Sequence, residues 1–397
     1  MKARLKKILF FQHVAWIGGS AGSLAQIVRH VRSQYEVHVV LCMDGPARGI
    51  LESLGAKVQI EPGIVPFCGA FSGEKNLWLN QENRRGFLHY KQSARIAQRI
   101  CEQLRPDIVY LNVSVLFPVA LGAKQAGVEK VVLHIREPLC FETGSLQEKI
   151  KNRIVDAYVD RLIAITDGNA ADFAPGKKCE IIHNWVDFSG RDGAFDPYTA
   201  YDIPRDRKIV LVLGGRHRCK GTLIALRAAS LLQRDDFTLL APGLNSSASR
   251  VKTLIRNILD IFKAKTYGRE MDRLTRSGHP KIIATLPVTA IKPLIEASSM
   301  VIFPFTQPHF SKGAIEAGAL RKPVIISNTQ PHLAGIRNNI SGIVIPSGDE
   351  TALAEAMGFL LDHPDEGARL GDGLHQLVER DFSETNSVSR ILKLLSD

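Results

Sequence analysis

Short apolar runs alternate with longer amphipathic stretches along most of the chain, which is the pattern of a parallel α/β protein. The runs are apolar on both faces, as strands buried between two helix layers must be. In the first half they lie at 8–12, 36–42, 57–60, 107–111, 130–135 and 161–165. Helical stretches separate several of them, at 22–33, 46–54 and 91–104. Because crossovers between parallel strands are right-handed, this order predicts a doubly wound sheet.

A second series of the same kind occupies the rest of the chain. Its predicted strands lie at 209–213, 237–241, 281–284, 300–304, 323–326 and 343–345. Its predicted helices lie at 221–233, 250–264, 288–297, 313–320 and 351–361. Residues 189–207 between the two series are rich in Gly, Pro and Asp, which is typical of a linker. Since 397 residues exceed one ordinary core, we expect an α/β protein of two Rossmann-like doubly wound parallel-sheet domains, at 1–195 and 196–380, followed by an amphipathic helix in 381–397.

The chain is basic, and its sequence contains no membrane-spanning segment. Its net charge of +11 implies an anionic partner, for which nucleic acid, anionic lipid and a phosphorylated substrate all qualify. No zinc finger, RNA-recognition signature or basic zipper accompanies the charge, so we expect no nucleic acid. The 6 cysteines form no CxxC pair, and no run of about 18 apolar residues occurs. These features predict a cytoplasmic protein with reduced thiols.

A glycine-rich turn, WIGGSAGS at 16–23, follows the first predicted strand. Gly18 and Gly19 would let backbone N–H groups approach an anion or a carbonyl oxygen at the start of a helix. The spacing does not meet the GxGxxG dinucleotide fingerprint. A plain strand-to-helix turn is the alternative interpretation.

A basic turn, GGRHRCKG at 214–221, follows the first strand of the second series. It places Arg216, Arg218 and Lys220 at the carboxyl end of a strand, directly before a helix. Fixed cations there would stabilise the charge that develops on a departing nucleoside diphosphate. The alternative is a solvated basic turn.

The segment 301–327 reads as a strand, a polar loop, a helix carrying Glu316 and a second strand. A carboxylate on a helix that begins just past the carboxyl end of a strand suits the binding of a nucleotide ribose. Small residues, including Gly313 and Ala314, would let a ligand or a backbone come close to the start of this helix. Otherwise Glu316 is an ordinary glutamate of a helix surface.

The segment LHIREP at 133–138 ends a strand of the first series. Strand alternation directs His134 and Arg136 to one side and Glu137 to the other. We take Glu137 as a candidate contact of the acceptor, whereas a histidine at a strand end can equally be structural.

In chain order, these blocks resemble those of family 4 retaining glycosyltransferases, which adopt the two-domain glycosyltransferase-B fold. Residues 16–23 are similar to the family's glycine-rich loop, 214–221 to its diphosphate motif and 301–327 to its donor-binding block. Two further blocks, 181–187 and 339–349, also stand where the family has matching ones. The resemblance implies that the two domains face a cleft and that the C-terminal helix packs back toward the first domain.

Two stretches depart from the family pattern in the second half of the chain. Arg216 and Lys220 are four positions apart, where most members have five, so the loop is shorter or Arg218 replaces one partner. Pro308 stands where the first of two glutamates is expected, and Glu316 matches the second. His309 and the backbone N–H groups from there to Lys312 are the nearest substitutes for the missing sugar contact. The Lys312 side chain would also reach a phosphate.

A third departure concerns the end of the strand at 130–135. Comparable segments of the family often read His-x-His-Glu, and a histidine there approaches the donor sugar. Arg136 stands in place of the second histidine, so either His134 or Arg136 inherits that contact.

The resemblance implies a retaining, metal-independent glycosyltransferase without a cofactor, in a pathway such as polysaccharide biosynthesis. Its donor would be a nucleoside diphosphate sugar of the UDP or GDP type, and its acceptor a saccharide or a lipid-linked sugar. The implied catalytic residues are His134, Arg136, Arg216 and Lys220. The implied donor-binding residues are Gly18, Gly19, Gly215, Arg218, His309, Phe310, Ser311, Lys312, Gly313, Ala314 and Glu316.

Two other functions stay open at this point. The proline at 308 and the shortened basic turn also fit a catalytically weak, glycosyltransferase-like binding protein. A nucleotide-sugar epimerase on the same architecture is the second alternative. The basic amphipathic stretch at 250–265 either rests on anionic lipid at the inner face of the membrane or simply covers a sheet.

Overall fold

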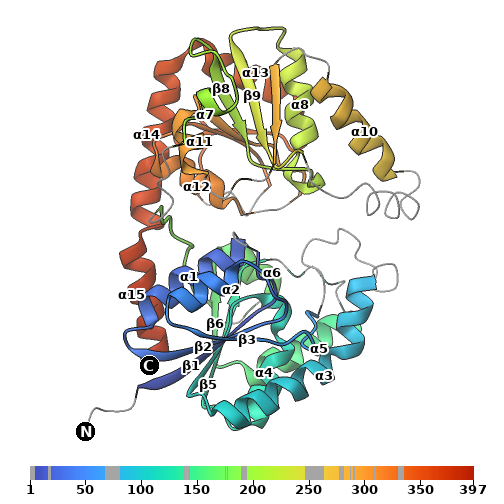
Figure 1. Cartoon of the computed structure of the whole chain (residues 1–397), viewed down its shortest axis with the longest axis vertical. Helices are drawn as coiled ribbons and strands as arrows, with labels where there is room; N and C mark the ends of the chain where they lie inside the picture. Colours follow the sequence, from blue (N-terminus) through green and yellow to red (C-terminus); the bar gives the residue numbers. More distant parts are fainter. Residues whose placement is uncertain are drawn as a thin grey trace. The chain divides into compact units, whose positions relative to one another are not determined.

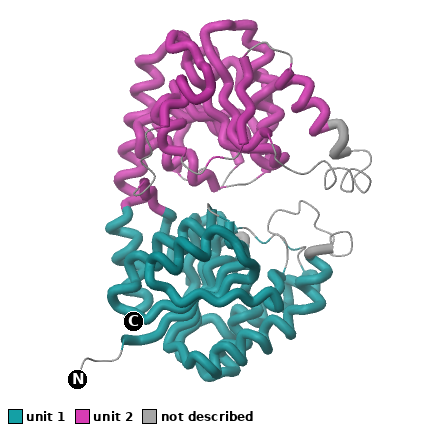
Figure 2. The backbone as a smooth tube through the Cα atoms, viewed as in Figure 1, with its two compact units in different colours: residues 1–184, 384–397 teal, residues 185–383 magenta. Residues whose placement is uncertain are grey.

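The computed structural model of the chain describes residues 5–16, 19–67, 81–137, 139, 141, 144–174, 176, 178–188, 195–245, 263–276, 281–286, 288, 291–307, 310–329 and 335–397. Gly18, Pro308, His309 and most of the predicted helix at 250–264 lie outside these residues. The chain divides into two compact units (Figure 2). Residues 1–184 and 384–397 form the first unit, and residues 185–383 form the second. The first unit therefore ends before the boundary that the sequence analysis placed at residue 195.

The first unit is built on a parallel sheet with the strand order β3-β2-β1-β4-β5-β6-β7. Its strands are β1 (Lys6–Gln12), β2 (Tyr35–Leu41), β3 (Lys57–Ile60), β4 (Ile108–Leu111), β5 (Lys130–Ile135), β6 (Arg161–Ala164) and β7 (Glu180–Ile181). The register sets Phe10 of β1 beside Val39 of β2 and Tyr110 of β4. The central strands are buried because helices cover both faces, as their continuous apolar sequence predicts.

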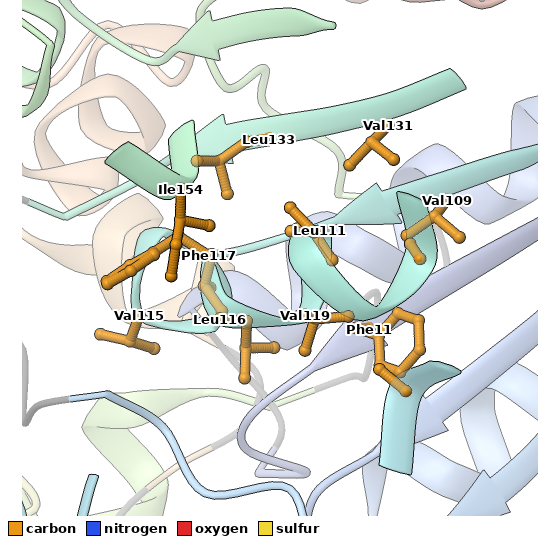
Figure 3. Packing of buried hydrophobic residues seen from close by; sticks show 14 of the residues in the cluster. Phe11, Val109, Leu111, Val115, Leu116, Phe117, Val119, Val131, Leu133 and Ile154 are labelled. Carbon is orange, nitrogen blue, oxygen red and sulfur yellow. The ribbon is translucent and has the colours of Figure 1, made fainter. Parts of the chain in front are cut away.

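Helices α1 (Gly19–Val31), α2 (Ala47–Ser53) and α15 (Glu384–Ser396) pack together over one face of this sheet (Figure 1). The other face carries α3 (Gln81–Leu104), α4 (Pro118–Gln125) and α5 (Leu146–Tyr158), and α6 (Asp167–Phe173) follows β6. Between the sheet and α4 and α5, apolar side chains interlock into the core (Figure 3). They include Phe11, Leu111, Val119, Leu133 and Ile154.

The C-terminal helix α15 belongs to the first unit and is held by polar contacts as well as by its apolar face. Its buried apolar residues are Ile391, Leu394 and Leu395. The Ser387 hydroxyl donates a hydrogen bond of 3.1 Å to the carbonyl of His183. The Lys130 ammonium of β5 donates one of 2.9 Å to the carbonyl of Leu395 near the end of the helix. The helix is therefore fixed along its length.

The second unit has a parallel sheet with the strand order β10-β9-β8-β11-β12-β13. Its strands are β8 (Lys208–Val212), β9 (Phe237–Pro242), β10 (Lys281–Thr285), β11 (Met300–Phe303), β12 (Val324–Ser327) and β13 (Ile343–Ile345). Helices α8 (Thr222–Leu231), α10 (Lys263–Arg276) and α13 (Glu350–Asp362) cover one face. The other face carries α7 (Pro197–Ala200), α11 (Lys292–Ala297), α12 (Lys312–Ala319) and α14 (Pro364–Asp381). Both layers are visible in Figure 1.

Each sheet reverses its winding direction beside its first strand. In the first unit β1 lies between β2 and β4, and in the second β8 lies between β9 and β11. Such a switch point leaves a crevice at the carboxyl ends of the strands, where open α/β sheets bind ligands. The predicted fold class of two Rossmann-like parallel-sheet domains is confirmed.

The structure corrects the linker that the sequence analysis placed at 189–207. Of this stretch, residues 195–207 are described, and they belong to the second unit. The rings of Phe195, Tyr198 and Tyr201 pack against the core beneath α11 and α12. Their apolar burial outweighs the Gly, Pro and Asp content that suggested a linker. The short strand β7 and the helices α4 to α6 and α14 were also not predicted.

Gly122 allows α4 to lie directly on α3, and its replacement offers a test of this packing. A Cβ atom at Gly122 would lie 1.9 Å from the carbonyl oxygen of Ala94 in α3. We expect Gly122→Ala to lower the free energy of unfolding by about 2–3 kcal/mol, because two helix backbones must separate. Gly49→Ala in α2 is the matched control, since its Cβ would meet no described atom within 4 Å. Gly49→Ala should raise the free energy of unfolding by about 0.5–1 kcal/mol. Urea unfolding of both variants measures the difference, and equal effects would contradict the tight contact.

Candidate functional site

The switch point of the first unit is bridged by polar side chains from three elements. The Asn112 amide, just past β4, donates 2.7 Å to Gln12 Oε1 at the end of β1 and 2.9 Å to the carbonyl of Ser20 in α1. The Gln12 amide donates to the Ser20 hydroxyl at 2.9 Å. Gly19 opens α1 with a φ of +48°, a conformation that favours glycine. The glycine turn is thus tied to the ends of two neighbouring strands, and its other predicted residue, Gly18, is not described.

Arg136 is held in place by polar groups of three residues. Its Nε donates to the carbonyl and to Oδ1 of Asn112, at 3.0 and 3.1 Å. One terminal nitrogen donates to Asn184 Oδ1, and the other lies 3.1 Å from His134 Nδ1. Arg136 and His134 therefore lie together, as strand alternation predicted. Asn184, which belongs to the block at 181–187, fixes this guanidinium.

His134 is buried, and its hydrogen bonds fix its tautomer. Its Nδ1 lies 2.7 Å from the hydroxyl of Tyr110 in β4 as well as 3.1 Å from Arg136. A guanidinium only donates, so Nδ1 must accept and the proton resides on Nε2. Among the described residues this Nε2 has no hydrogen-bond partner. Burial, assisted by the charge of Arg136, lowers the pKa of His134 well below its ordinary value, so the ring is neutral.

Glu137 points away from this pair and caps a short helix. Its Oε1 accepts hydrogen bonds from the backbone N–H groups of Ser114 and Val115, at 2.8 and 3.4 Å, at the start of η1 (Ser114–Leu116). Burial raises the pKa of the carboxyl to about 7, although these bonds oppose the shift. The structure therefore gives Glu137 a structural role in place of the acceptor contact that we expected.

In the second unit the basic turn after β8 is fastened to the end of the neighbouring strand β11. The backbone N–H of Thr306 donates 2.9 Å to the carbonyl of Cys219, and its hydroxyl donates 3.1 Å to that of Arg218. Gly215 and Gly221 have φ values of +54° and +68°. A Cβ at Gly221 would lie 1.6 Å from the carbonyl oxygen of Pro304, so only glycine fits. The turn is thereby fixed at the switch point.

The two arginines of the turn already have partners. Arg216 donates 2.9 Å to the carboxylate of Asp272 in α10 and 3.3 Å to the carbonyls of Leu244 and Gly268. The guanidinium of Arg218 lies 5.0 Å from the centre of the Tyr267 ring, also in α10. Both side chains face α10, which differs from the direct diphosphate contact that the sequence analysis assigned to them.

Lys220 differs from these arginines because its ammonium has no ion pair or side-chain hydrogen bond among the described residues. The side chain is partly buried. Desolvation lowers its pKa, with only a weak opposing effect from Cys219. A desolvated cation without a counter-ion is unfavourable by itself and favours the binding of an anion. Lys220 is therefore the strongest anion-binding candidate of the turn.

Glu316 lies on α12, which follows the next strand, β11, at the same edge of the sheet. The residue is 3% exposed, and Lys312 Nζ lies 4.0 Å from its Oε1. The Ser311 hydroxyl caps the helix by accepting from the N–H of Ala314 at 3.2 Å. The carboxylate is thus held in a buried position near a helix start, as ribose binding would require.

The remaining predicted donor-binding residues support this loop by packing. The Phe310 ring lies 6.3 Å from that of Phe382. A Cβ at Gly313 would meet the Phe303 ring at 3.0 Å, and Ala314 is fully buried. These three residues therefore pack at the start of α12 and hold it in position.

Sequence reasoning missed the polar residues that complete the network of the first unit. Gln12 is the last residue of an apolar strand and Asn112 directly follows one, which is a usable signal for a polar group at the ligand-binding ends of the strands. Tyr110 gave no such signal, because it lies within an apolar strand. Among the described residues, no group of three or more His, Cys, Asp or Glu side chains could hold a metal ion. None of the described helices is both long and apolar enough to cross a membrane.

Comparison with known proteins identifies relatives of the second unit and of the whole chain. Residues 199–374 match the family model described as glycosyl transferases group 1. The chain is 25% identical, over 90% of its length and 80% of the relative's, to a D-inositol 3-phosphate glycosyltransferase of Corynebacterium urealyticum.

Solved structures with the same fold cover nearly the whole chain. The crystal structure of Anabaena HepE in complex with UDP and glucose matches with a TM-score of 0.74 and 17% identity, over 98% of this chain and 99% of HepE. Sucrose-phosphate synthase of Thermosynechococcus elongatus matches with a TM-score of 0.71 and 15% identity, over 98% of each chain. At these identities the likeness concerns the fold.

The pKa of Glu137 makes a pH-dependent contribution to stability that Glu137→Gln should remove. The folded-state pKa of about 7 lies above the ordinary value of 4.5, so the carboxyl stabilises the fold when protonated. This contribution is complete below about pH 4.5 and is lost as the pH rises to about 7, by on the order of 3 kcal/mol. The glutamine keeps the oxygen that accepts from Ser114 and does not titrate.

We therefore expect the wild type to lose stability relative to Glu137→Gln between pH 4.5 and 7.5. Urea unfolding at several pH values measures this difference, in which most other titrating groups cancel. A relative gain for the wild type with rising pH would mean that Glu137 is charged in the folded protein.

Proposed function

Because residues 199–374 match the family model of glycosyl transferases group 1, we propose that the chain is a retaining, metal-independent glycosyltransferase. It takes a sugar from a nucleoside diphosphate sugar of the UDP or GDP type and transfers it to a saccharide or lipid-linked acceptor. The observation that carries this proposal is the unpaired, partly buried ammonium of Lys220 at the switch point of the second unit.

The donor diphosphate binds, in this proposal, at the turn between β8 and α8. Lys220 supplies the fixed positive charge, and the start of α8 adds backbone N–H groups that favour an anion. Arg216 and Arg218 act indirectly, by fixing the turn against Asp272 and Tyr267 of α10. The charge that develops on the leaving diphosphate is thereby stabilised by a group already in place.

Glu316 binds the ribose hydroxyls of the same donor. Because β8 and β11 are neighbouring strands, the turn with Lys220 and the helix with Glu316 emerge side by side at one sheet edge. A nucleotide that extends across these two strand ends presents its diphosphate to Lys220 and its ribose to Glu316. Two of the similar structures are complexes of HepE, one with UDP and glucose and one with UDP-glucose. They support a nucleotide-sugar donor for this chain.

Retention follows, in this proposal, from departure of the diphosphate ahead of attack by the acceptor on the same face of the sugar. The oxocarbenium-like transition state is stabilised by the departing phosphate, whose charge Lys220 balances. Further roles of His134 and Arg136 at the reacting sugar stay predictions. A bound nucleotide without any mass increase on an acceptor would favour the epimerase or the weakly active binding protein.

The α3 helix supports the proposed contact with an anionic membrane, for which the stretch 250–265 was predicted. Its cations Arg84, Arg85, Lys91, Arg95 and Arg99 are all exposed. Spacings of three and four residues place most of them on one face, with Leu88, which is 69% exposed. None of the five forms an ion pair or side-chain hydrogen bond with a described residue. This basic stripe with an apolar residue fits the headgroup region of an anionic bilayer.

Replacing Lys220 by methionine should weaken nucleotide binding strongly without harming the fold. The methionine keeps the apolar stem and removes a desolvated charge, so the melting temperature should stay equal or rise. The affinity for UDP or GDP should fall about 100-fold, because a charge-assisted contact to phosphate is lost. Calorimetry with UDP, GDP and the matching nucleosides measures the effect, and sugar transfer should disappear with it.

Lys281→Met is the matched control, because Lys281 begins β10 and so lies at the amino edge of the same sheet. It should leave nucleotide affinity unchanged. A Lys220→Met protein that binds UDP and GDP as well as the wild type would refute the proposed diphosphate site.

The contact with membranes is tested with vesicles. We expect the double variant Lys91→Glu, Arg95→Glu to bind vesicles containing phosphatidylglycerol at least about tenfold more weakly, at about 1 kcal/mol for each cation. Sedimentation with these vesicles and with pure phosphatidylcholine vesicles measures binding. Arg48→Glu, Lys57→Glu makes the same change of net charge at residues that are paired with Glu52 and Glu36. If this control loses as much binding, net charge alone is responsible and α3 is not the contact.

A further inference from the structure

The guanidinium of Arg136 forms no ion pair with a described carboxylate. Its bonded partners are the carbonyl and amide oxygens of Asn112, the amide oxygen of Asn184 and the imidazole of His134, all of them neutral groups. The nearest acid along the chain, Glu137, uses its carboxyl on the backbone of η1 and forms no ion pair with Arg136. Desolvation lowers the pKa of Arg136 to about 10, although the nearby charges of Tyr110 and Glu137 oppose this shift.

The same contacts fix Arg136 but leave some of its hydrogen-bond donors without an acceptor. A guanidinium has five N–H donors, and these hydrogen bonds occupy one on Nε and one on each terminal nitrogen. Each terminal nitrogen therefore keeps one free donor. Carboxylate and phosphate are the groups that arginine binds with two donors at once. The side chain is partly exposed, so a ligand can reach it.

A second donor in this network also lacks a partner. The Nε2–H of His134 is buried, with the residue 2% exposed, and no described atom accepts from it. Unpaired buried donors are rare in folded proteins and call for a ligand or an ordered water. Both donors lie at the carboxyl ends of β4 and β5, the edge at which such sheets bind ligands.

We propose that Arg136 binds an acidic group, carboxylate or phosphate, carried by a sugar that is a substrate of this chain. A neutral sugar would leave the guanidinium uncompensated, whereas an acidic one supplies the missing counter-ion. The inference rests on the proposed glycosyltransferase function and specifies its substrate class. The acidic sugar is either the one transferred from the donor or the one in the acceptor.

The two sources are separated by pairs of probes that differ in one charge. The donor pair is UDP-glucose and UDP-glucuronate, or GDP-mannose and GDP-mannuronate if the guanine nucleotide is the one that binds. The acceptor pair is glucose and glucose 6-phosphate, titrated alone and with the bound nucleotide. We expect the wild type to bind the acidic member of one pair at least tenfold more tightly than the neutral member.

Two variants test whether Arg136 causes this preference. Arg136→Gln should remove the preference, so that the acidic and the neutral member bind with similar affinity. Asn184→Asp keeps the shape of the amide but places a carboxylate beside the guanidinium, so the arginine gains an internal counter-ion. This variant should melt at a higher temperature than the wild type and should also lose the preference for the acidic probe. It keeps the test valid if Arg136→Gln does not fold.

The outcomes separate the inference from the proposed function. Lack of preference in both pairs, or an unchanged preference in Asn184→Asp, overturns the role of Arg136. A loss of UDP and UDP-glucose affinity by the same factor in Arg136→Gln also overturns it, because the anion is then the diphosphate. If neither UDP nor GDP binds, the proposed function fails, and glucose 6-phosphate still decides the role of Arg136.

Discussion

An open parallel sheet binds ligands at the carboxyl ends of its strands, and the rest of this structure depends on that constraint. The strands are buried on both faces, so polar residues find room only where the strands end. Gln12 ends β1, Asn112 follows the neighbouring strand β4, and the turn with Lys220 follows β8, so all three lie at the strands where the winding reverses. There the connecting helices diverge to opposite faces of the sheet, and the ends of the strands stay open to a ligand.

Whether a charged side chain at these strand ends can bind a ligand depends more on its ion-pair partners than on its residue type. Arg216 and Lys220 belong to one turn, yet Arg216 is neutralised by Asp272 and supports the turn. Lys220 and Arg136 form no ion pair with an acidic side chain among the described residues. Their desolvated charges lower the stability of the unliganded fold, and the anions that we propose as ligands would recover this cost. Stability and binding therefore oppose each other at these two positions.

The proposed role of Arg136 would let one substitution change the substrate while the scaffold persists. Asn112 connects the guanidinium to Gln12 and to the glycine turn, and Tyr110 and Arg136 together fix the tautomer of His134. A neutral histidine with its free proton on Nε2 is a donor to an uncharged oxygen. The neighbouring Arg136 adds two donors for a charged group such as a carboxylate or a phosphate. One edge can thus recognise both parts of an acidic sugar.

The sequence by itself determined the alternation of strands and helices, the two-domain fold class and the strand ends at which polar groups gather. These features depend on local periodicity, and the apolar runs of buried strands are long enough to reveal them. The tertiary structure alone decided which charges are paired. Asp272 reaches Arg216 across 56 positions of the chain, and Asn184 reaches Arg136 across 48. It also turned Glu137 toward η1 and drew the aromatic residues of the expected linker into the second core, because such contacts arise only when distant segments pack.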